Sequence, residues 1–353
     1  MYKSFEIHNF KCFRELKLDK LARINLIAGM NNVGKTALLE AIFLNNGIYN
    51  QELFLRLSHI RGVEFLNLTP QSWDEYPFSS FFYKFNISDS IELLSEDTIT
   101  GYRSTQVNVS TNSTSTEPAI ILKLEHKEEN RSIVYNLTIS NGSISFGPVP
   151  SIDFGSVYNS PPFPIFETIF YDSKITIDPQ QQAEIYGKLQ IVGKENDVWK
   201  ILKLIEPRLI RIASIATARN SMLYGDIGIG HFVPLHLMGE GMVHLANFVL
   251  KIANTSNKVI LIDEIENGLH YSVMTNVWKA IASAAKEYNT QVFATTHSWE
   301  CVLAAHEAFE SSETYDSDFQ LHRLDRLNDD DIKVVTYNKR SLTAAIKAGL
   351  EVR

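Results

Sequence analysis

The sequence predicts an α/β protein with a mixed, largely parallel core sheet, an antiparallel β subdomain and a helical insertion. Apolar runs at Ile24–Ala28, Val259–Ile262 and Gln291–Thr295 have the length of buried strands, and helix-like segments follow them. Strands that alternate with helices are typical of a parallel sheet. Between the first run and the other two, several short segments alternate apolar and polar residues, which is typical of antiparallel strands.

Composition narrows the class of protein. The 353 residues include 33 Lys plus Arg against 41 Asp plus Glu, so no overall basic field indicates nucleic-acid binding. Cys12 and Cys301 are the only cysteines and form no C-x-x-C pair, which argues against a zinc site or a disulfide scaffold. No apolar run approaches the length of a membrane span, and we expect a cytoplasmic protein with no membrane contact.

The segment Gly29–Thr36 fits G-x-x-x-x-G-K-[ST] at every fixed position, with a strand before it and the helix-like Ala37–Phe43 after it. That context favours a phosphate-binding loop over a bare glycine-rich turn, because loop and helix N–H groups can then face an anion. Lys35 would reach the β- and γ-phosphates, and Thr36 would hold magnesium. The expected nucleotide-binding residues are Gly29, Asn31, Asn32, Gly34, Lys35, Thr36 and Ala37.

A β-ribbon, Tyr2–Phe10 and Phe13–Leu18, precedes this loop. Its turn, Asn9–Phe13, carries aromatic and cationic side chains. They could stack on an adenine or touch a ribose, or they could form a hydrophobic tip, and the sequence leaves both readings open.

The middle of the chain shows further short strands, and residues 51–62 have a helical pattern. Asn141-Gly142 is a hairpin turn signal. Ser104–Glu117 is so rich in Ser, Thr and Asn that it predicts an exposed loop. The expected strands are Ser90–Leu94, Ala119–Glu125, Ser132–Ser140 and Ser143–Phe146.

The proline-dense stretch Pro148–Pro164 marks a boundary before a strand at Phe166–Tyr171 and helices near 178–187 and 194–205. This is the most basic neighbourhood of the chain. It could be a solvated face or a surface for nucleic acid or a partner. Its cations are Lys188, Lys194, Lys200, Lys203, Arg208, Arg211 and Arg219.

Three later segments bear on chemistry. Gly239-Glu240-Gly241 opens a helix, where N–H groups can approach an anion. Asp263 and Glu264 end the second apolar strand, where an NTPase needs one carboxylate for magnesium and one to polarise water. His297 follows the third strand; because the carboxyl ends of parallel strands line the ligand crevice, we favour a γ-phosphate contact over a structural histidine.

The C-terminal part predicts a hairpin, Phe319–Leu324 and Ile332–Tyr337, and then a helix. Its turn, Asn328–Asp331, contains three aspartates. An acidic turn is favoured over a metal site, because Asn and Asp are common turn residues.

With these motifs in order, the chain resembles the ABC-type ATPases of the RecF, SMC and OLD branch, and most closely the OLD-like AAA-family ATPases of bacterial phage-defence systems. The resemblance implies an ABC-type ATPase head. The stretch after His297 is too short for the Toprim nuclease domain of full-length OLD proteins. The residues that carry the resemblance are Phe10–Phe13, Gly29–Thr36, Gly239–Gly241, Ile262–His270 and Ala294–Ser298.

The resemblance also implies roles. ATP and Mg²⁺ would be the cofactors, with Lys35, Glu264 and His297 catalytic: Glu264 would align the attacking water, and His297 would sense the γ-phosphate. Thr36 and Asp263 would hold the metal. Gly239, Glu240 and Gly241 would correspond to the signature loop, which contacts nucleotide held by a second protomer, so a homodimer or a higher homo-oligomer is expected.

The resulting expectation is an ATP-hydrolysing switch that dimerises around ATP and controls a separate effector in antiphage defence, either a nuclease, such as a Toprim-type protein, or a toxin. The alternative is a RecF-like DNA-binding repair ATPase, with nucleic acid as its partner. The expected parts are an N-terminal ATPase segment 1–50, a β-rich part 51–165, a helical and β insertion 166–230, and a C-terminal ATPase segment 231–353.

Overall fold

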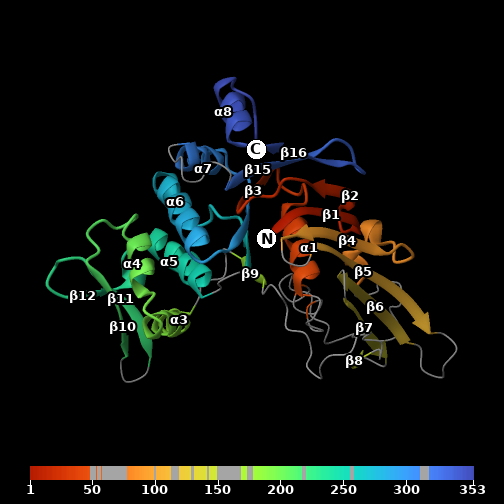
Figure 1. The fold of residues 1–353 in the computed structure, drawn as a ribbon, viewed down its shortest axis with the longest axis horizontal. Helices are drawn as coiled ribbons and strands as arrows, with labels where there is room; N and C mark the ends of the chain where they lie inside the picture. The colour runs from red at the N-terminus through yellow and green to blue at the C-terminus, as the bar shows by residue number, and fades with distance from the viewer. Residues whose placement is uncertain are drawn as a thin grey trace. The chain divides into compact units, whose positions relative to one another are not determined.

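The structure is a computed structural model that describes residues 1–47, 53, 57, 78–98, 101–112, 119–128, 131–140, 143–148, 168–172, 178–216, 220–254, 258–310 and 318–353. The chain forms two compact units, and each is described by itself (Figure 1). Unit 1 comprises Met1–Leu21, Asn31–Thr168 and Leu324–Val335. Unit 2 comprises Ala22–Met30, Ile169–Arg323 and Thr336–Arg353.

Unit 1 contains a seven-stranded sheet in the order β2-β1-β4-β5-β6-β7-β8, in which every neighbouring pair is antiparallel. The helix that follows the phosphate loop, α1 (Lys35–Gly47), belongs to the same unit. Two 3-10 turns, η2 (Ser79–Phe81) and η3 (Tyr83–Phe85), precede β4. The strands are β1 (Tyr2–Phe10), β2 (Phe13–Leu18), β4 (Ile91–Asp97), β5 (Gly101–Asn112), β6 (Ala119–Glu128), β7 (Arg131–Ser140) and β8 (Ser143–Pro148).

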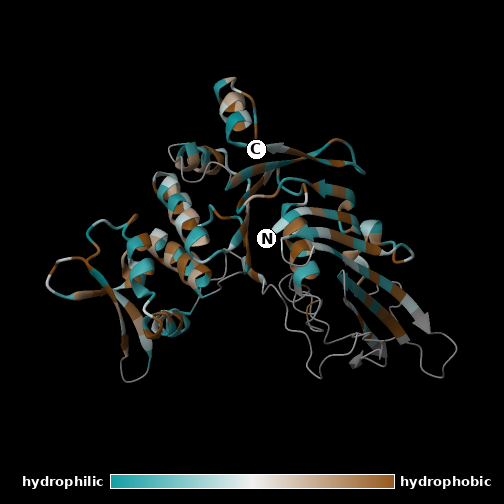
Figure 2. Ribbon diagram, in the orientation of Figure 1, coloured by the Kyte–Doolittle hydropathy of each residue, from teal (hydrophilic) through white to brown (hydrophobic). Residues whose placement is uncertain are grey.

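Alternating hydropathy along these strands explains the sheet, and it is visible as bands along β1 and β4 (Figure 2). In β1, Phe5 and Ile7 are buried, whereas Glu6 and His8 between them are only partly buried. Successive side chains of a strand point to opposite faces, so one face of the sheet packs on the core and the other meets solvent. The predicted ribbon and the four strands predicted in the middle of the chain are confirmed, with small shifts of their ends.

The predicted exposed loop at Ser104–Glu117 is wrong for its first part, because β5 occupies Gly101–Asn112 between β4 and β6. The residues after Asn112 in that stretch lie outside the described residues. The side chains of Arg103, Thr105 and Val107, at every second position of β5, are buried on one face of the sheet. The Ser- and Thr-rich composition suggested a segment exposed to solvent, but polar side chains of this strand form hydrogen bonds with partners inside the unit.

Those partners form a buried polar network with the end of α1. Arg103 donates to the Asp97 carboxylate at 3.0 Å and to the Asn46 side-chain oxygen at 3.0 Å. The Thr105 hydroxyl donates to the Asn45 side-chain oxygen at 2.8 Å. Hydrogen bonding offsets the desolvation of these polar groups, which is why a polar strand can lie in a core.

Unit 2 is built on a six-stranded sheet in the order β16-β15-β3-β14-β13-β9, and β15 and β16 continue into unit 1. β3, β14 and β13 are parallel neighbours, with Ala28 opposite Thr296 and Ile262 opposite Ala294. Every residue of β3 and β14 is buried, as expected for central strands of a covered sheet. The strands are β3 (Ile24–Gly29), β9 (Thr168–Asp172), β13 (Val259–Asp263), β14 (Gln291–Thr296), β15 (Phe319–Arg326) and β16 (Ile332–Tyr337).

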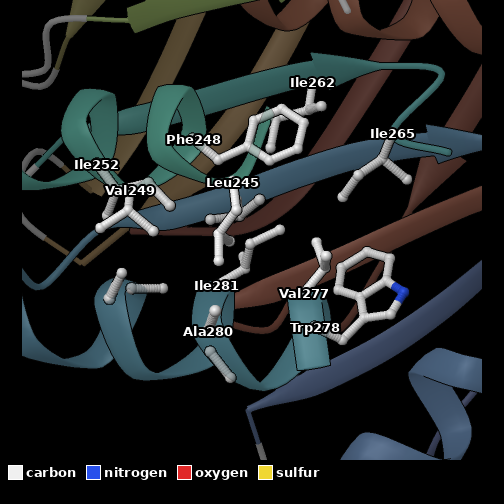
Figure 3. Packing of buried hydrophobic residues seen from close by; sticks show 14 of the residues in the cluster. Leu245, Phe248, Val249, Ile252, Ile262, Ile265, Val277, Trp278, Ala280 and Ile281 are labelled. Carbon is white, nitrogen blue, oxygen red and sulfur yellow. The ribbon is translucent and has the colours of Figure 1, made fainter. Parts of the chain in front are cut away.

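Helices of unit 2 supply most of its apolar core. In Figure 3, Leu245 of α5 lies beside Ile281 of α6, and Phe248 of α5 lies beside Ile262 of β13. Burying each such side chain stabilises the fold by about 1.5–3 kcal/mol. The helices are α3 (Pro179–Ile191), α4 (Glu195–Leu202), α5 (Glu240–Ala253), α6 (Tyr271–Glu287), α7 (Trp299–Glu310) and α8 (Lys339–Lys347), and a 3-10 turn η4 (Leu235–Leu237) precedes α5.

Two features of unit 2 go beyond the sequence prediction. After the two predicted helices, the basic neighbourhood contains a three-stranded antiparallel sheet, β10 (Arg211–Ala216), β11 (Ser221–Asp226) and β12 (Phe232–Pro234). Helix α7 was not predicted, although Ser298 caps it by accepting a hydrogen bond from the Cys301 N–H at 3.1 Å.

The predicted fold class is confirmed: an α/β protein with a mixed core sheet that contains parallel strands, an antiparallel β part and helices. The predicted turn Asn141-Gly142, most of the predicted helix 51–62 and Arg219 lie outside the described residues. In the described part of the chain, no helix is both long and apolar enough to cross a membrane.

Candidate active site

The phosphate loop leaves β3 at Gly29 and ends where α1 begins at Lys35. Gly34 has a φ of +110°, and a Cβ there would lie 2.6 Å from the Cys12 sulfur and 2.7 Å from the Phe13 ring. Only glycine satisfies both conditions. Burial raises the pKa of the Cys12 thiol, so a neutral side chain stands behind the loop. A glycine-containing loop that leads into a helix N-terminus is typical of an anion cradle.

A basic side chain braces the loop from the end of β15. The Arg326 guanidinium donates to the Asn32 carbonyl oxygen and to the Asp329 carbonyl oxygen, both at 3.3 Å. Asn32 has a φ of +63°, which is uncommon for a residue other than glycine. The contact therefore helps to hold the loop in a conformation that its sequence alone disfavours.

The ribbon turn beside the loop is a hydrophobic tip, one of its two predicted readings. Phe10 and Phe13 are 0% and 1% exposed, so neither ring is available to stack on a base. The Lys11 ammonium pairs with the buried Glu40 carboxylate of α1 and lies 5.0 Å from the Phe81 ring centre. The turn thus anchors α1.

A threonine links the two acids at the end of β13. The Thr295 hydroxyl, on neighbouring strand β14, donates to an Asp263 carboxylate oxygen at 2.6 Å and accepts from the Glu264 N–H at 2.8 Å. Thr295 is fully buried, so it has little freedom to leave this position. The two hydrogen bonds fix the Asp263 carboxylate and the Glu264 backbone relative to each other.

The loop after β13 then orients the Glu264 side chain. Glu264 itself has a φ of +50°, a strained conformation for a side chain of its kind. The Asn267 amide donates to a Glu264 carboxylate oxygen at 2.7 Å, and the Asn267 N–H donates to the Glu264 carbonyl oxygen at 2.9 Å. Strain that is held by specific contacts is common at functional sites.

His297 follows β14 and is held by the same loop. Its N–H donates to a Glu266 carboxylate oxygen at 2.8 Å, and its Nδ1 lies 3.0 Å from the same oxygen. The side chain is 42% exposed, whereas that of Glu266 is 11% exposed. Glu266 therefore engages one ring nitrogen and leaves Nε2 for a ligand.

Sequence reasoning did not assign the positioning roles of Thr295, Glu266 and Asn267. All three lie within motifs that it singled out, and adjacency to Glu264 and His297 was the available signal. Their pairing depends on the parallel register of β13 and β14, which a single sequence does not reveal.

The glycine-flanked helix start also lies in unit 2. Gly239 precedes α5 with a φ of +104°, and Glu240 is its first helical residue. A Cβ at Gly241 would lie 3.9 Å from the Leu269 side chain and 3.8 Å from that of Val273. Leu237, just before these glycines, is 68% exposed.

The expected site residues divide between the two units. Gly29, at the end of β3, follows the Ala28 that lies opposite Thr296, so unit 2 brings the start of the phosphate loop beside the strand that carries Thr295 and leads to His297. The expected residues of unit 2 are Gly29, Gly239, Glu240, Gly241, Asp263, Glu264 and His297. Those of unit 1 are Asn31, Asn32, Gly34, Lys35, Thr36 and Ala37.

Three cations of the basic neighbourhood lie beside acidic side chains, as they can on a solvated face. Lys200, Arg208 and Arg211 lie 3.8, 2.8 and 3.1 Å from the carboxylates of Asp197, Glu206 and Asp226. Exposed ion pairs of this kind reduce the positive field that a nucleic acid would meet.

Other acidic groups need no metal ion. Asp330, in the β15–β16 turn, accepts from the Tyr83 hydroxyl at 2.6 Å and pairs with Lys84. Among the described residues, the ligand atoms of Glu6, His8 and Glu15 lie within 4.8 Å of one another. Glu6 there already pairs with His8 at 2.8 Å and Lys17 at 3.7 Å, so we assign no ion to this cluster.

Known proteins share parts of this chain. An "ATP/GTP phosphatase" from Helicobacter pylori is 27% identical over 331 residues, which is 86% of each chain. The "Uncharacterized protein MJECL10" from Methanocaldococcus jannaschii is 50% identical over 44 residues, 12% of this chain and 20% of that protein. Among solved structures, the SMC head domain from Thermotoga maritima has a TM-score of 0.49 and 13% identity, covering 96% of this chain and 99% of the other.

A family profile also matches the chain. It is described as "AAA domain, putative AbiEii toxin, Type IV TA system", and it matches residues 24–302. The matched region includes the phosphate loop, both acids of β13 and His297. Because the match spans well over half of the sequence, the chain belongs to this AAA-domain family and is an ATPase of the AAA/ABC type.

Proposed function

We propose that this ATPase hydrolyses ATP in a magnesium-dependent reaction in which Glu264 aligns the attacking water. The observation that carries the proposal is the Thr295 hydroxyl, which bonds both Asp263 and the Glu264 backbone, in a buried strand that is also paired with the strand leading into the phosphate loop. Two acids fixed at the end of a parallel strand suit an NTPase, since one can serve the metal and the other the water.

The donor types fit the nucleotide and its ion. We assign the phosphates to the loop N–H groups and Lys35, because the loop matches the phosphate-binding pattern and leads directly into the N-terminus of α1. Thr36 and Asp263 offer the hydroxyl and carboxylate oxygens that magnesium prefers, and the bound ion would neutralise charge on the phosphates. His297 would contact the γ-phosphate through Nε2, because Glu266 already engages the other side of its ring.

We further propose that ATP is shared between two copies of the chain. The α5 start at Gly239–Gly241 would contact the nucleotide of the second copy, as in the OLD-like ATPases that the sequence resembles. Leu237, just before this helix start, is 68% exposed and so is a position at which the association can be tested.

In this proposal the dimer is a cytoplasmic switch for a separate effector, a nuclease or a toxin, in antiphage defence. The family description, "putative AbiEii toxin, Type IV TA system", applies to the matched domain itself, so it supports a link to toxin systems and does not separate a nuclease effector from a toxin effector. The RecF-like alternative is disfavoured, because Lys200, Arg208 and Arg211 already have acidic neighbours. Salt-sensitive stimulation of turnover by duplex DNA would reverse that preference.

The test compares two variants in ATP-binding and phosphate-release assays. Glu264→Gln should bind ATP as wild type does and lose about 100- to 10,000-fold in kcat, because only water activation is removed. Lys35→Ala should lose ATP binding, because the phosphate charge then has no ammonium partner. Lys347→Ala, at an exposed lysine of α8, is the matched control. Equal turnover by wild type and Glu264→Gln would refute the assignment.

A further inference from the structure

We propose that His244 is a positioning residue for hydrolysis: its ring supports Gly268 and thereby fixes the loop that orients Glu264. The inference rests on the proposed role of Glu264. It adds a residue on a different helix, α5, that contacts neither acid of β13.

The contact between His244 and Gly268 is unusually close. A Cβ built on Gly268 would lie 2.4 Å from His244 Nε2, 2.9 Å from Cδ2 and 3.2 Å from Cε1. Gly268 also has a φ of +71°. The imidazole edge therefore occupies the space of the missing side chain, and glycine is required both for its backbone conformation and for the approach of the ring.

Gly268 lies in the same short loop as the groups that hold the catalytic side chains. The preceding Asn267 bonds the Glu264 carboxylate at 2.7 Å. The Leu269 N–H bonds the Glu266 carbonyl oxygen at 3.1 Å, and the Glu266 carboxylate bonds the His297 N–H. A shift of Gly268 would move its covalent neighbours and so displace the Glu264 carboxylate.

Stability alone does not explain an imidazole at this position. His244 is 5% exposed, and its Nδ1 has no hydrogen-bond partner in the part of the chain that the structure describes. Burial lowers the pKa of His244, opposed by the Glu240 charge, so the ring is neutral near pH 7. A buried polar atom without a partner destabilises a fold, and an aliphatic side chain would avoid that cost.

The same helix approaches this loop at a second position. Gly241 stands one turn before His244 on α5, and a Cβ built there would lie 3.9 Å from the Leu269 side chain. The start of α5 therefore lies close to the loop both at Gly268 and at Leu269. Movement of the glycine-flanked helix start on association would therefore reach the Glu264 loop through His244.

The test is a double-substitution cycle on the full chain, with ATP turnover, binding of a fluorescent ATP analogue and thermal unfolding as readouts. His244→Leu should lower kcat about 10- to 100-fold, because a small misplacement of Glu264 slows attack of water. Its affinity for the analogue should stay within about twofold of wild type, and Tm should stay level or rise, since the unpaired nitrogen is gone.

Gly268→Ala should also lower kcat, and the double variant should be no slower than Gly268→Ala alone, because both act on one contact. In the Glu264→Gln background, His244→Leu should cause no further loss. Multiplicative losses in either combination, or a kcat loss that only tracks a fall in Tm, would overturn the inference.

The same measurements distinguish a failure of the His244 inference from a failure of the proposed function on which it rests. Wild-type turnover by His244→Leu, with the Glu264→Gln loss intact, would refute the positioning role alone. Turnover that does not depend on Glu264 would refute the proposed function, and the inference with it.

Discussion

Thr295 shows how one hydroxyl can organise two acidic residues. It uses its single proton toward Asp263 and a lone pair toward the Glu264 N–H, so both partners constrain its rotation. Because Thr295 is buried in a strand with neighbours on both sides, the pair inherits the rigidity of the sheet. The acids are thus positioned before any ligand binds.

Removing this hydroxyl should slow hydrolysis without unfolding the chain. Thr295→Val keeps the branched shape but removes the hydrogen bond that Thr295 makes to the Asp263 carboxylate and the one that it accepts from the Glu264 N–H, and we expect a loss of about 10- to 100-fold in kcat. Thr295→Ser retains the hydroxyl and should remain within a few-fold of wild type. Steady-state phosphate release measures both, and equal loss by the two variants would contradict the hydrogen-bonding role.

Site residues could be predicted from the sequence where they belong to a local motif whose chemistry is known. Gly34, Lys35, Asp263 and Glu264 could be singled out because their neighbours in sequence define the pattern. His244 could not, since its role depends on Gly268 of another segment. The roles of Thr295 and Glu266 could not be predicted either, because they too depend on contacts with residues of other segments.

Among elements, the pairing of β15 with β3 has a titratable group at its centre. His322 of β15 is fully buried, with Nε2 3.3 Å from the Asn25 side-chain oxygen of β3 and Nδ1 2.9 Å from the Thr336 hydroxyl of β16. Burial lowers the pKa of His322 to about 4. The neutral ring is therefore part of the folded strand arrangement.

Acid should destabilise the fold through this group. In the unfolded chain this histidine has a pKa of about 6.5. Between that pH and about pH 4, the unfolded chain therefore binds a proton at this position and the folded chain does not. The free energy of unfolding is therefore highest near pH 7.5 with respect to this group, and protonation of the unfolded chain lowers it by about 2 kcal/mol at pH 5.0. Urea unfolding at the two pH values measures the difference.

A substitution isolates the contribution of His322 from that of other histidines. His322→Asn should show a smaller loss of unfolding free energy between pH 7.5 and 5.0 than wild type, by about the same 2 kcal/mol. The comparison uses the change with pH within each variant, so overall destabilisation does not affect it. An unaltered pH dependence would contradict the assignment.

Strand β5 shows why element prediction failed in one place. A run of Ser, Thr and Asn predicts a loop because such residues compete with the backbone for hydrogen bonds. Arg103 and Thr105 instead face Asp97, Asn45 and Asn46, which lie far away in sequence or in another element. The strands β3 and β14 were predictable because each contains a run of apolar residues long enough to be read as a buried strand.

For the whole molecule, the proposed function requires association that depends on ATP. Glu264→Gln, which should retain ATP, is expected to double in mass by light scattering when ATP is added, and wild type should do so only transiently. Gly241 is a poor site for a disrupting substitution, because it packs beside Leu269 and Val273. The exposed Leu237 is better suited.

In the Glu264→Gln background, Leu237→Asp should lower the dimer fraction at a given ATP concentration, because it places a charge in an apolar contact. Leu350→Asp is the matched control, since Leu350 is also exposed, at 57% against 68%. A mass that ATP leaves unchanged, or an equal effect of both substitutions, would rule out the shared-nucleotide arrangement.

The register that sets Ala28 opposite Thr296 also has a consequence in time. β3 leaves the ribosome early, but its parallel neighbour β14 is made only after most of the chain, so the feeding strand of the phosphate loop waits without that partner. An apolar strand with an open edge is prone to pair with other chains. Synthesis of this protein therefore passes through a long interval in which the segment on which nucleotide binding depends is exposed to association with other chains.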